Sequence, residues 1–219
     1  MPAAKGDCHQ CRLPEYACIC QLIPKAESAA CFWLITHDKE FDKPTNTGKL
    51  IQAAIPGTRI FNWSRTSPDK VLLELLDDPD WLPVLLFPKE YAAQSNTRQW
   101  HDNSGGERKV AFIIIDATWQ QARKMYRQSP WLHGLNLLSL QPEEPSIYRL
   151  RRNRQEQHLC TAEVAARALG ELGENTNRQL MEALVQVYCD RYLWARKGQR
   201  RDEDSRSLRI LEQYRSGAQ

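Results

Sequence analysis

The sequence predicts an α/β fold in which a mostly parallel β-sheet is flanked by helices and preceded by a small cysteine-rich segment. Three observations lead to this prediction. After Lys25, short apolar runs alternate with stretches of helical periodicity, a pattern typical of parallel strands joined by crossover helices. The run 110–115 is apolar at every position, as expected of a strand covered on both faces. Four cysteines crowd into the first twenty residues.

The first part of the sheet domain reads as strand, helix, strand. Residues 30–36 form an apolar strand. A helix over 47–54 follows, because Thr45 and Asn46 are favourable N-cap residues. The run 59–63 is the second predicted strand.

The next helix is predicted from its end signals. It opens at 67–69, where Ser, Pro and Asp supply a cap residue, a proline at the first helical position and an acidic first turn, and it ends at 78–79. Prolines bound a third strand at 83–87, and 110–115 is the fourth. The intervening residues 89–109 are polar and predict a loop.

The last part of the domain is richer in helix. Residues 119–127 are predicted to be helical, and 136–140 and 146–150 to be short strands. Two helices follow, an Ala-rich one at 161–172 and a longer one at 176–195 with apolar residues at helical spacing.

The composition agrees with a folded protein. Of 219 residues, 42% are hydrophobic and 26% are charged, which excludes disorder throughout. The apolar runs are too short to cross a bilayer and the first ten residues lack the apolar core of a signal peptide, so we expect a cytoplasmic protein. We divide the chain into an N-terminal segment, 1–25, a main domain, 26–197, and a charged tail, 198–219, which we expect to fray.

The N-terminal cysteines have the spacing of metal ligands. They are Cys8, Cys11, Cys18 and Cys20. A C-x2-C pair and a C-x-C pair supply the four thiolates that a closed tetrahedral zinc site requires. Such a site leaves no position for substrate, so its expected role is to fold a segment with little apolar content. The alternative is a group of reduced thiols without metal.

Positive charge is concentrated in the C-terminal third, although 30 Lys and Arg against 27 Asp and Glu give a net charge of only +3. One cluster comprises Arg149, Arg151, Arg152 and Arg154. A second cluster lies within 191–201. A solvated helix face explains either cluster alone. The two together favour a surface that binds nucleic-acid phosphates.

Polar residues that directly follow an apolar run are the first candidates for a site, because ligands of an open parallel sheet bind beyond the carboxyl ends of its strands. Three junctions qualify, at 36–40 continuing to 45–48, at 88–90 and at 116–119. The sequence contains no glycine-rich dinucleotide motif and no Walker loop, which disfavours nucleotide-phosphate enzymes of those classes.

Taken alone, the third junction has an ordinary structural explanation. Asp116 can N-cap the following helix, with Thr118 as a competitor for that role. Trp119 is equally well explained as a core residue.

Read together, residues 116–125 closely resemble the defining segment of the DTW-domain family, the tRNA-uridine aminocarboxypropyltransferases; the segment is Asp-Ala-Thr-Trp-Gln-Gln-Ala-Arg-Lys-Met. Further blocks between residues 8 and 165 resemble the family in the family's order. These are the cysteine spacing, His37-x-x-Glu40 with Thr45-Asn46-Thr47, Phe87-Pro88, Tyr148-Arg149-Leu150-Arg151 and Leu159-Cys160-Thr161-x-Glu163-Val164-Ala165. A serine is usual in the family where this chain has Cys160.

The resemblance implies a reaction and a fold. The reaction is transfer of the 3-amino-3-carboxypropyl group from S-adenosyl-L-methionine to N3 of a tRNA uridine, expected in the variable loop, giving acp3U and methylthioadenosine. The fold implied for 26–197 is similar to that of SPOUT methyltransferases, with a trefoil knot in the C-terminal half. The residues themselves favour the parallel sheet but not the knot, since knotted chains are rare. The expected partners are tRNA and S-adenosylmethionine, without a membrane, and the protein is expected to be a monomer or homodimer.

The resemblance also implies roles for individual residues. Asp116 is the first candidate to accept the N3 proton or orient the uracil, and Glu163 is the second, although Cys160-x-x-Glu163 also has capping-box spacing. The implied cofactor-binding residues are Phe87, Pro88, Thr118, Trp119, Leu159 and Thr161. The implied substrate-binding residues are His37, Glu40, Asn46, Thr47, Arg123, Arg149, Arg151, Arg152 and Arg154. His37 is equally well explained as a structural histidine.

Two other classes of function remain open. A SPOUT-type RNA methyltransferase uses the same cofactor but releases adenosylhomocysteine. A non-catalytic, zinc-containing RNA-binding module explains the cysteines and arginines but gives no role to 116–125.

Overall fold

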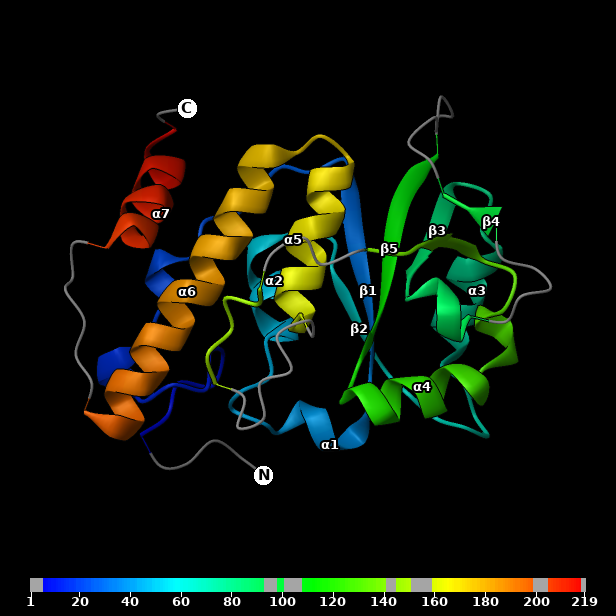
Figure 1. Ribbon diagram of the computed structural model, residues 1–219, viewed down its shortest axis with the longest axis horizontal. Helices are drawn as coiled ribbons and strands as arrows, with labels where there is room; N and C mark the ends of the chain where they lie inside the picture. The colour runs from blue at the N-terminus through cyan, green and yellow to red at the C-terminus, as the bar shows by residue number, and fades with distance from the viewer. Residues whose placement is uncertain are drawn as a thin grey trace. The chain divides into compact units, whose positions relative to one another are not determined.

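The computed structural model describes residues 6–92, 98–100, 108–140, 145–150, 159–198 and 205–217, and its strands form one parallel sheet (Figure 1). The strands are β1 (Ala30–Thr36), β2 (Arg59–Asn62), β3 (Trp81–Leu86), β4 (Arg98–Gln99), β5 (Lys109–Asp116) and β6 (Asn136–Leu138). They lie in the order β2-β1-β5-β3-β6-β4, and every neighbouring pair is parallel. The predicted α/β class and parallel sheet are therefore confirmed.

The central strands β1 and β5 are buried on both faces. Trp33 and Ile113 lie on the face that helices α3 (Lys70–Asp77) and α4 (Trp119–Arg127) cover, in a cluster that includes Leu72 and Met125. Phe112 lies on the opposite face and is also fully buried. Successive side chains of a strand point to opposite faces, so burial on both explains why 110–115 is apolar at every position.

Contacts along the chain divide it into two units. Residues 28–41 and 57–141 form the sheet unit, which contains all six strands together with α1 (Asp38–Phe41), α3 and α4. Residues 1–27, 42–56 and 142–219 form the helical unit, which contains α2 (Gly48–Ala54), α5 (Thr161–Glu171), α6 (Asn175–Lys197) and α7 (Arg206–Ser216).

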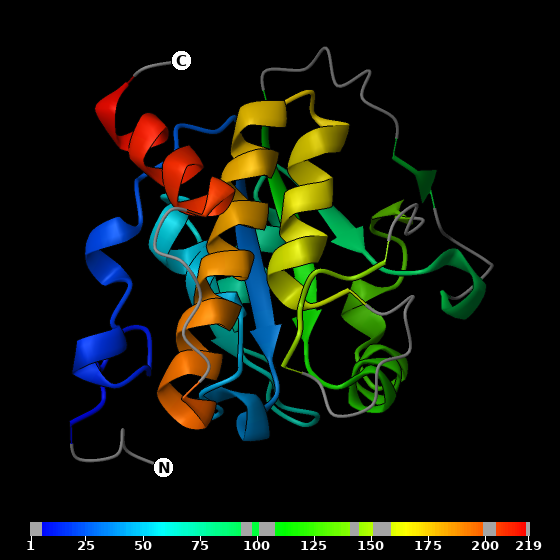
Figure 2. The same ribbon diagram turned by 60° about the vertical axis from the view of Figure 1, so that its left-hand side comes forward.

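Within the helical unit, α5 and α6 form an antiparallel pair, and α7 lies against α6 (Figure 2). Ala165 and Ala168 of α5 are fully buried, which allows the two helix backbones to approach closely. Leu180 and Leu184 of α6 are fully buried as well. These residues explain the Ala-rich and Leu-containing periodicities of the two predicted helices.

The tail that we expected to fray contains α7, so that prediction is wrong for 206–216. Ser205 N-caps this helix, its Oγ accepting a hydrogen bond from the Leu208 N–H at 3.2 Å. Leu211 is 1% exposed, and the Tyr214 hydroxyl donates to Asn177 Oδ1 at 2.6 Å. Burial of Leu211 and the hydrogen bond to α6 therefore stabilise α7, although its charged sequence indicates a helix only weakly.

Three further expectations need correction. The helix predicted to open at 67–69 is α3, and it begins at Lys70. The Asp69 carboxylate caps it by accepting from two backbone N–H groups. Residues 145–150 form no strand. The loop 89–109 contains a 3-10 helix, η3 (Lys89–Tyr91), and the short strand β4, which pairs with β6.

In the part of the chain that the structure describes, no helix combines the length and apolar character that crossing a membrane requires.

Candidate functional site

The carboxyl end of β5 carries a buried carboxylate. Asp116 is the last residue of the strand and is 4% exposed. It pairs in register with Thr36, the last residue of β1, and the Thr36 hydroxyl donates to Asp116 Oδ2 at 3.3 Å. In Figure 1 both strands point toward α1 and α4. The position matches the rule that ligands of a parallel sheet gather beyond the carboxyl ends of its strands.

Thr118, and not Asp116, is the N-cap residue of α4. The Gln121 N–H donates to Thr118 Oγ1 at 3.4 Å, and Gln121 Oε1 accepts from the Thr118 N–H at 3.1 Å. This reciprocal pair is a capping box. The competition between Asp116 and Thr118 for the cap is therefore decided for Thr118, and the structural explanation of Asp116 as a cap is wrong.

His37 follows β1 and contacts the same region. Its backbone N–H donates to the Asp116 carbonyl at 3.1 Å. Its Nδ1 accepts from the Lys39 N–H at 3.1 Å, and its ring stacks on Trp63 with centroids 6.0 Å apart. Gln121 Nε2 lies 3.5 Å from the other ring nitrogen. These contacts favour a structural histidine that shapes the end of β1. Glu40, in α1, is 8% exposed.

An aromatic cluster lies beyond the end of β3. The Phe87 ring stacks on Tyr126 at 4.7 Å between centroids and lies 5.8 Å from the Trp119 ring. Tyr91 of η3 meets Trp119 edge to face at 5.2 Å, and the Arg123 guanidinium lies 4.2 Å from the Tyr91 ring centroid. Pro88, which lies between Phe87 and η3 in the sequence, is half-buried. The sequence did not single out Tyr91, because nothing in the local pattern indicates its contact with α4.

In the helical unit, Glu163 is a buried carboxylate with three donors. It is 4% exposed and lies in the first turn of α5. Its oxygens accept from the Cys160 N–H at 2.7 Å, the Ile147 N–H at 2.7 Å and the Ser146 hydroxyl at 2.8 Å. The first of these contacts is the backward half of the predicted capping box. The other two hold 146–147 against the helix, which explains why this segment is not a strand.

The segment 44–48 is held in the same unit. Thr47 Oγ1 accepts from the Ala162 N–H at 3.2 Å, and the Tyr148 hydroxyl donates to the Thr45 carbonyl at 2.7 Å. Asn46 Oδ1 accepts from the Gly48 N–H at 2.8 Å. Thr47 thereby satisfies a free N–H at the start of α5, a role that its sequence position did not reveal.

Cys160 is the N-cap residue of α5 and is 3% exposed. Burial raises the pKa of this thiol well above its usual range, and the neighbouring Glu163 carboxylate acts in the same direction. The thiol therefore stays protonated at neutral pH. Leu159 and Thr161, its chain neighbours, are half-buried.

Arg149 is the one member of its predicted arginine cluster that falls among the described residues. Its guanidinium forms an ion pair with Asp190 of α6, and both side chains are largely buried. Its Nε is buried without a hydrogen-bond partner among the described residues. The predictions for Arg151, Arg152 and Arg154 lie outside those residues.

The structure thus sorts the described candidates into two groups. The sheet unit carries His37, Glu40, Phe87, Pro88, Asp116, Thr118, Trp119 and Arg123. The helical unit carries Asn46, Thr47, Arg149, Leu159, Thr161 and Glu163.

The four N-terminal cysteines converge in the helical unit. Their sulfur atoms all lie within 4.8 Å of one another. Cys8 Sγ is 3.6 Å from Cys20 Sγ, and Cys11 Sγ is 3.7 Å from Cys18 Sγ. A zinc–sulfur bond of about 2.3 Å in a regular tetrahedron separates the sulfur atoms by about 3.8 Å. The donor set and its spacing therefore fit zinc.

The local backbone prepares this cluster for metal. The Cys8 N–H donates to the Leu13 carbonyl at 2.7 Å, and Arg12, with φ 63°, adopts the left-handed conformation that closes the loop. Burial acts to raise the pKa of the Cys8 thiol, but backbone N–H groups of Cys11 and Gln10 and the neighbouring thiols outweigh it and lower this pKa to about 7. Burial raises the pKa of the Cys18 and Cys20 thiols in the same cluster, so Cys8 ionises more readily than either of them.

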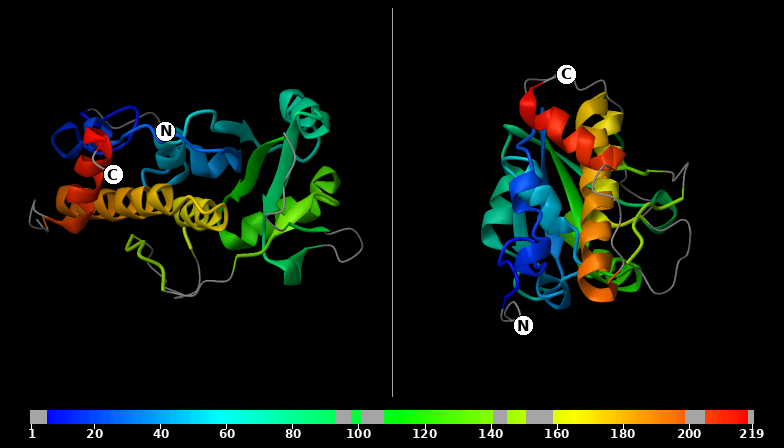
Figure 3. Two further views of the ribbon diagram at one scale, coloured as in Figure 1. Left: turned by 90° about the horizontal axis from the view of Figure 1, so that it is seen from above. Right: turned by 90° about the vertical axis from the view of Figure 1, so that its left-hand side faces the viewer.

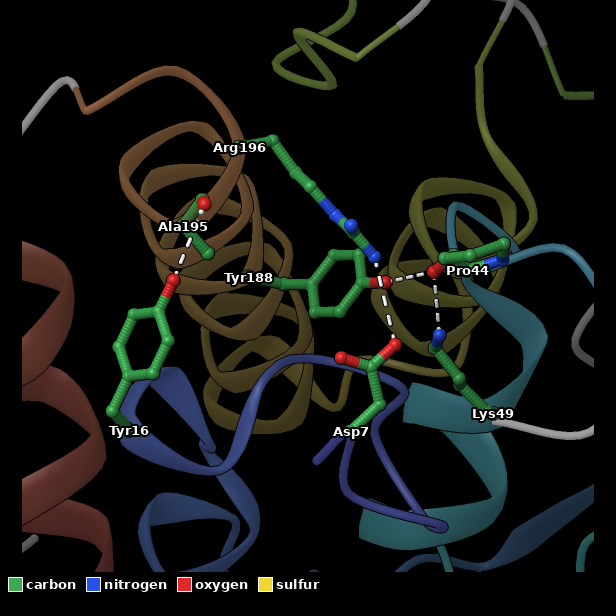
Figure 4. Close-up of polar contacts among 7 residues, drawn as sticks. All are labelled: Asp7, Tyr16, Pro44, Lys49, Tyr188, Ala195 and Arg196. Carbon is green, nitrogen blue, oxygen red and sulfur yellow. Dashed lines mark hydrogen bonds and ion pairs between the residues drawn. The ribbon is translucent and has the colours of Figure 1, made fainter. Parts of the chain in front are cut away.

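The cysteine segment packs on the C-terminal part of α6 (Figure 3). The Tyr16 hydroxyl donates to the Ala195 carbonyl at 3.3 Å, and its ring meets Trp194 edge to face at 5.3 Å. Arg196 pairs with Asp7 at 3.5 Å. Figure 4 shows the hydrogen bond from Tyr16 to Ala195 and the ion pair between Arg196 and Asp7.

A second set of contacts lies beside them in Figure 4. Lys49 Nζ donates to the Pro44 carbonyl at 2.6 Å, and the Tyr188 hydroxyl donates to the same oxygen. Burial lowers the pKa of Lys49 to about 7, while the charge of the nearby cysteine sulfurs opposes this shift. Four thiolates at a metal centre would therefore favour the charged form of Lys49.

Comparison with known proteins gives a consistent result. The family model described as the DTW domain matches residues 5–193. A protein of Drosophila melanogaster, tRNA-uridine aminocarboxypropyltransferase 2, is 28% identical over 191 residues, which cover 84% of this chain and 72% of the relative. A protein of the same name from Macaca fascicularis is 26% identical over 182 residues, covering 78% of this chain and 58% of the relative. No solved structure gives a significant match.

Proposed function

The chain belongs to the DTW-domain family, and from this premise we propose that it is a tRNA-uridine aminocarboxypropyltransferase. The two relatives that carry this name support the proposal. The observation that carries it is the position of the family's defining segment, which begins with a buried carboxylate at the carboxyl end of a central strand and continues into α4. The co-substrate in this proposal is S-adenosylmethionine, and the product is a tRNA uridine carrying the 3-amino-3-carboxypropyl group on N3.

The reaction requires a carbon electrophile, a nitrogen nucleophile and a group that takes a proton. S-adenosylmethionine, when bound, supplies a Cγ carbon activated by its sulfonium. The bond between uracil N3 and Cγ forms as the bond between Cγ and sulfur breaks, so methylthioadenosine leaves and the N3 proton is released. Asp116 is the residue proposed to accept that proton or to orient the uracil; it is buried, and a carboxylate at a strand end suits either role.

One aromatic side chain of the sheet unit, Trp119, is partly exposed and suited to stack on the adenine of the co-substrate, whereas the Phe87 ring beside it is 4% exposed and packs against Trp119. Phe87 and Trp119 lie beyond the carboxyl ends of β3 and β5, and their rings are 5.8 Å apart. Aromatic stacking on a base contributes about 1–3 kcal/mol. Pro88 and Thr118 flank these residues in the sequence. In the helical unit, Leu159 and Thr161 are the proposed cofactor-binding residues.

The contacts of Glu163 change its proposed role. A carboxylate that accepts from two backbone N–H groups and one hydroxyl is well satisfied, which favours the positioning of 146–147 over proton transfer. We therefore propose that Asp116 alone acts on the uracil and that Glu163 positions the segment leading to the arginine cluster.

The remaining substrate contacts are assigned to His37, Glu40, Asn46, Thr47 and Arg123, with Arg149, Arg151, Arg152 and Arg154 holding tRNA phosphates. Asn46 and Thr47 already make contacts within their own segment and with α5, which supports a positioning role for the loop they form.

We further propose one structural zinc ion per chain, held by the four N-terminal cysteines. A SPOUT-like arrangement with a knotted C-terminal half, a cytoplasmic location and the variable loop as the modified region belong to the same proposal. The wholly parallel sheet supports the fold relationship.

Mass spectrometry of tRNA nucleosides tests the function. We expect cells that lack the gene to lose acp3U, and the purified protein to restore it on their tRNA with release of methylthioadenosine. Release of adenosylhomocysteine would instead identify a methyltransferase. Absence of S-adenosylmethionine binding in solution, together with tRNA binding, would identify a non-catalytic RNA-binding module.

A further inference from the structure

The outer surface of η3 and α4 combines an exposed aromatic ring with a guanidinium group. Tyr91 is 40% exposed, although large aromatic side chains are usually covered. The guanidinium of Arg123 lies 4.2 Å from the centroid of its ring, and Arg123 is itself exposed. Trp119 meets the same ring edge to face, at 5.2 Å. An aromatic ring and a planar cation are therefore presented together to solvent.

The same helix carries further positive charge. In α4, Lys124 and Arg127 are exposed along with Arg123, and the helix contains no acidic residue. Its other face is buried through Ala122, Met125 and Tyr126. The helix thus presents an apolar side to the sheet and a cationic side to solvent.

The adjoining 3-10 helix is mixed in charge. Lys89 and Glu90 of η3 are both exposed, so they contribute no net charge. The positive character of the surface therefore comes from α4.

Packing alone accounts poorly for this arrangement. A cation over a tyrosine ring contributes about 0.5–1 kcal/mol at an exposed site, which explains the contact between Arg123 and Tyr91. Lys124 and Arg127 lie in the last turn of α4, where the helix dipole favours cations, but neither effect requires the Tyr91 ring to be exposed. Proteins that bind unpaired nucleotides combine these components, with rings and guanidinium planes that stack on bases and cations that follow the phosphates. The charge of the surface is complementary to RNA and not to a basic or neutral partner.

We propose that the surface formed by Tyr91, Arg123, Lys124 and Arg127 binds an unpaired segment of the tRNA, with Tyr91 and Arg123 stacking on a base and Lys124 and Arg127 contacting its phosphates. The proposal rests on the proposed function in taking tRNA as the substrate. It adds a binding surface in the sheet unit to the arginine cluster at 149–154 of the helical unit.

The test is binding of full-length tRNA to the zinc-loaded, full-length protein over a series of salt concentrations. We expect Tyr91→Leu to weaken binding about 5-fold or more, the lower end of the contribution of one stacked base, without changing the salt dependence. Tyr91→Phe should bind as the wild type does. The double variant Lys124→Gln/Arg127→Gln should reduce the log–log salt slope by about 0.7 for each lost contact to single-stranded RNA.

Two matched variants separate stacking from charge and from folding. Arg123→Lys keeps the charge but loses the planar guanidinium, so it should weaken binding with an unchanged slope. Lys70→Gln removes an exposed charge from α3 in the same unit and should change neither affinity nor slope. Thermal unfolding of each variant shows that the fold is retained.

Wild-type affinity in both Tyr91→Leu and Arg123→Lys, or a wild-type slope in the double variant, would overturn the proposal. Loss of binding to anionic phosphatidylserine vesicles in Tyr91→Leu, with unchanged tRNA binding, would assign the surface to membranes instead. The proposed function is scored separately by methylthioadenosine release from the wild-type protein. If the wild type binds tRNA but releases none, that function fails while the RNA-binding surface stands.

Discussion

Two buried carboxylates, Asp116 and Glu163, differ in their hydrogen-bond donors. Asp116 accepts from the hydroxyl of Thr36, whereas Glu163 accepts from two backbone N–H groups and the hydroxyl of Ser146. The three donors of Glu163 come from Cys160, Ser146 and Ile147, so this carboxylate joins the start of α5 to the segment 146–147 and serves the fold. The sequence ranked these two residues as alternatives for one role. We now expect substitutions at Asp116 and at Glu163 to have different effects.

Asp116→Asn tests the role of the first carboxylate. Asparagine keeps an oxygen that can accept from Thr36 but cannot take a proton at neutral pH. We expect folding and S-adenosylmethionine affinity to be nearly preserved and the chemical step to slow roughly 100-fold or more. Single-turnover transfer to tRNA, alongside thermal unfolding, measures this. Asp77→Asn, at an exposed aspartate in α3, is the control. Near-wild-type transfer would remove Asp116 from the chemistry and leave the proton to solvent or Glu163.

Glu163→Gln is expected to have the opposite profile. The amide retains one acceptor oxygen, but its NH2 group faces donors, so at least one of the three hydrogen bonds is lost. Hydrogen bonds to charged groups contribute about 1.5–3 kcal/mol each, and we expect the free energy of unfolding to fall by at least about 1.5 kcal/mol. Denaturant unfolding measures it, with Glu171→Gln at the exposed end of α5 as the control. Transfer per folded molecule should stay near the wild-type rate; a large fall at unchanged stability would make Glu163 a catalytic residue.

We expect Arg149 to have a different role from the other three residues of the arginine cluster. Because Arg149 pairs with Asp190, we expect its charge to contribute less to tRNA binding than the charges of the other three arginines. Arg→Gln at Arg151, Arg152 and Arg154 together should flatten the salt dependence of binding by about one log–log unit per lost contact at most.

Arg149→Gln should instead lower stability, because it breaks the largely buried ion pair with Asp190, and Asp190→Asn in the same chain should recover part of the loss. Salt titrations and thermal unfolding of these variants check both statements. An unchanged salt slope in the triple variant would contradict the phosphate role.

At the scale of elements, the core strands and longest helices follow from local pattern. Strand 30–36 and helix 119–127 have the predicted bounds. The strand is buried on both faces and its sequence is almost entirely apolar, whereas the helix is buried on one face and its apolar residues recur at helical spacing. Elements that depend on distant partners were missed. Residues 146–150 contain Ile147 and Tyr148, which favour strands, but the carboxylate of Glu163 takes the Ile147 N–H that a strand neighbour would need. Helix α7 is charged in sequence and depends on Leu211 and Tyr214 meeting α6.

The candidate site shows the same division. The types and order of its residues follow from the sequence, since the family motifs are continuous segments. The contacts of Glu163 with Ser146 and Ile147, and the contact of Tyr91 with Arg123, join segments that lie far apart in the chain. No periodicity carries that information.

At the scale of the whole molecule, the seven cysteines divide by environment. Four form the metal-binding group. The other three are buried, and burial raises the pKa of Cys31 and of Cys189 to about 11 and that of Cys160 well above its usual range. Because a thiol reacts as its thiolate, these three should be inert at neutral pH and become reactive only as the pH approaches 11 or the protein unfolds.

Counting reactive thiols therefore tests the zinc site and the fold together. We expect no iodoacetamide adducts on the native, zinc-loaded protein, adducts on the four N-terminal cysteines after chelation, and adducts on all seven after denaturation. Intact-mass spectrometry and elemental analysis provide the measurements.

Protons compete with metal for the thiolates, so zinc should be lost as the pH falls and retained as it rises. Chelation also removes the support of Tyr16 and Asp7 at the end of α6, so turnover should fall together with the thermal stability of the protein. Less than half an equivalent of metal, or loss of turnover with the fold and tRNA binding untouched, would contradict a structural zinc.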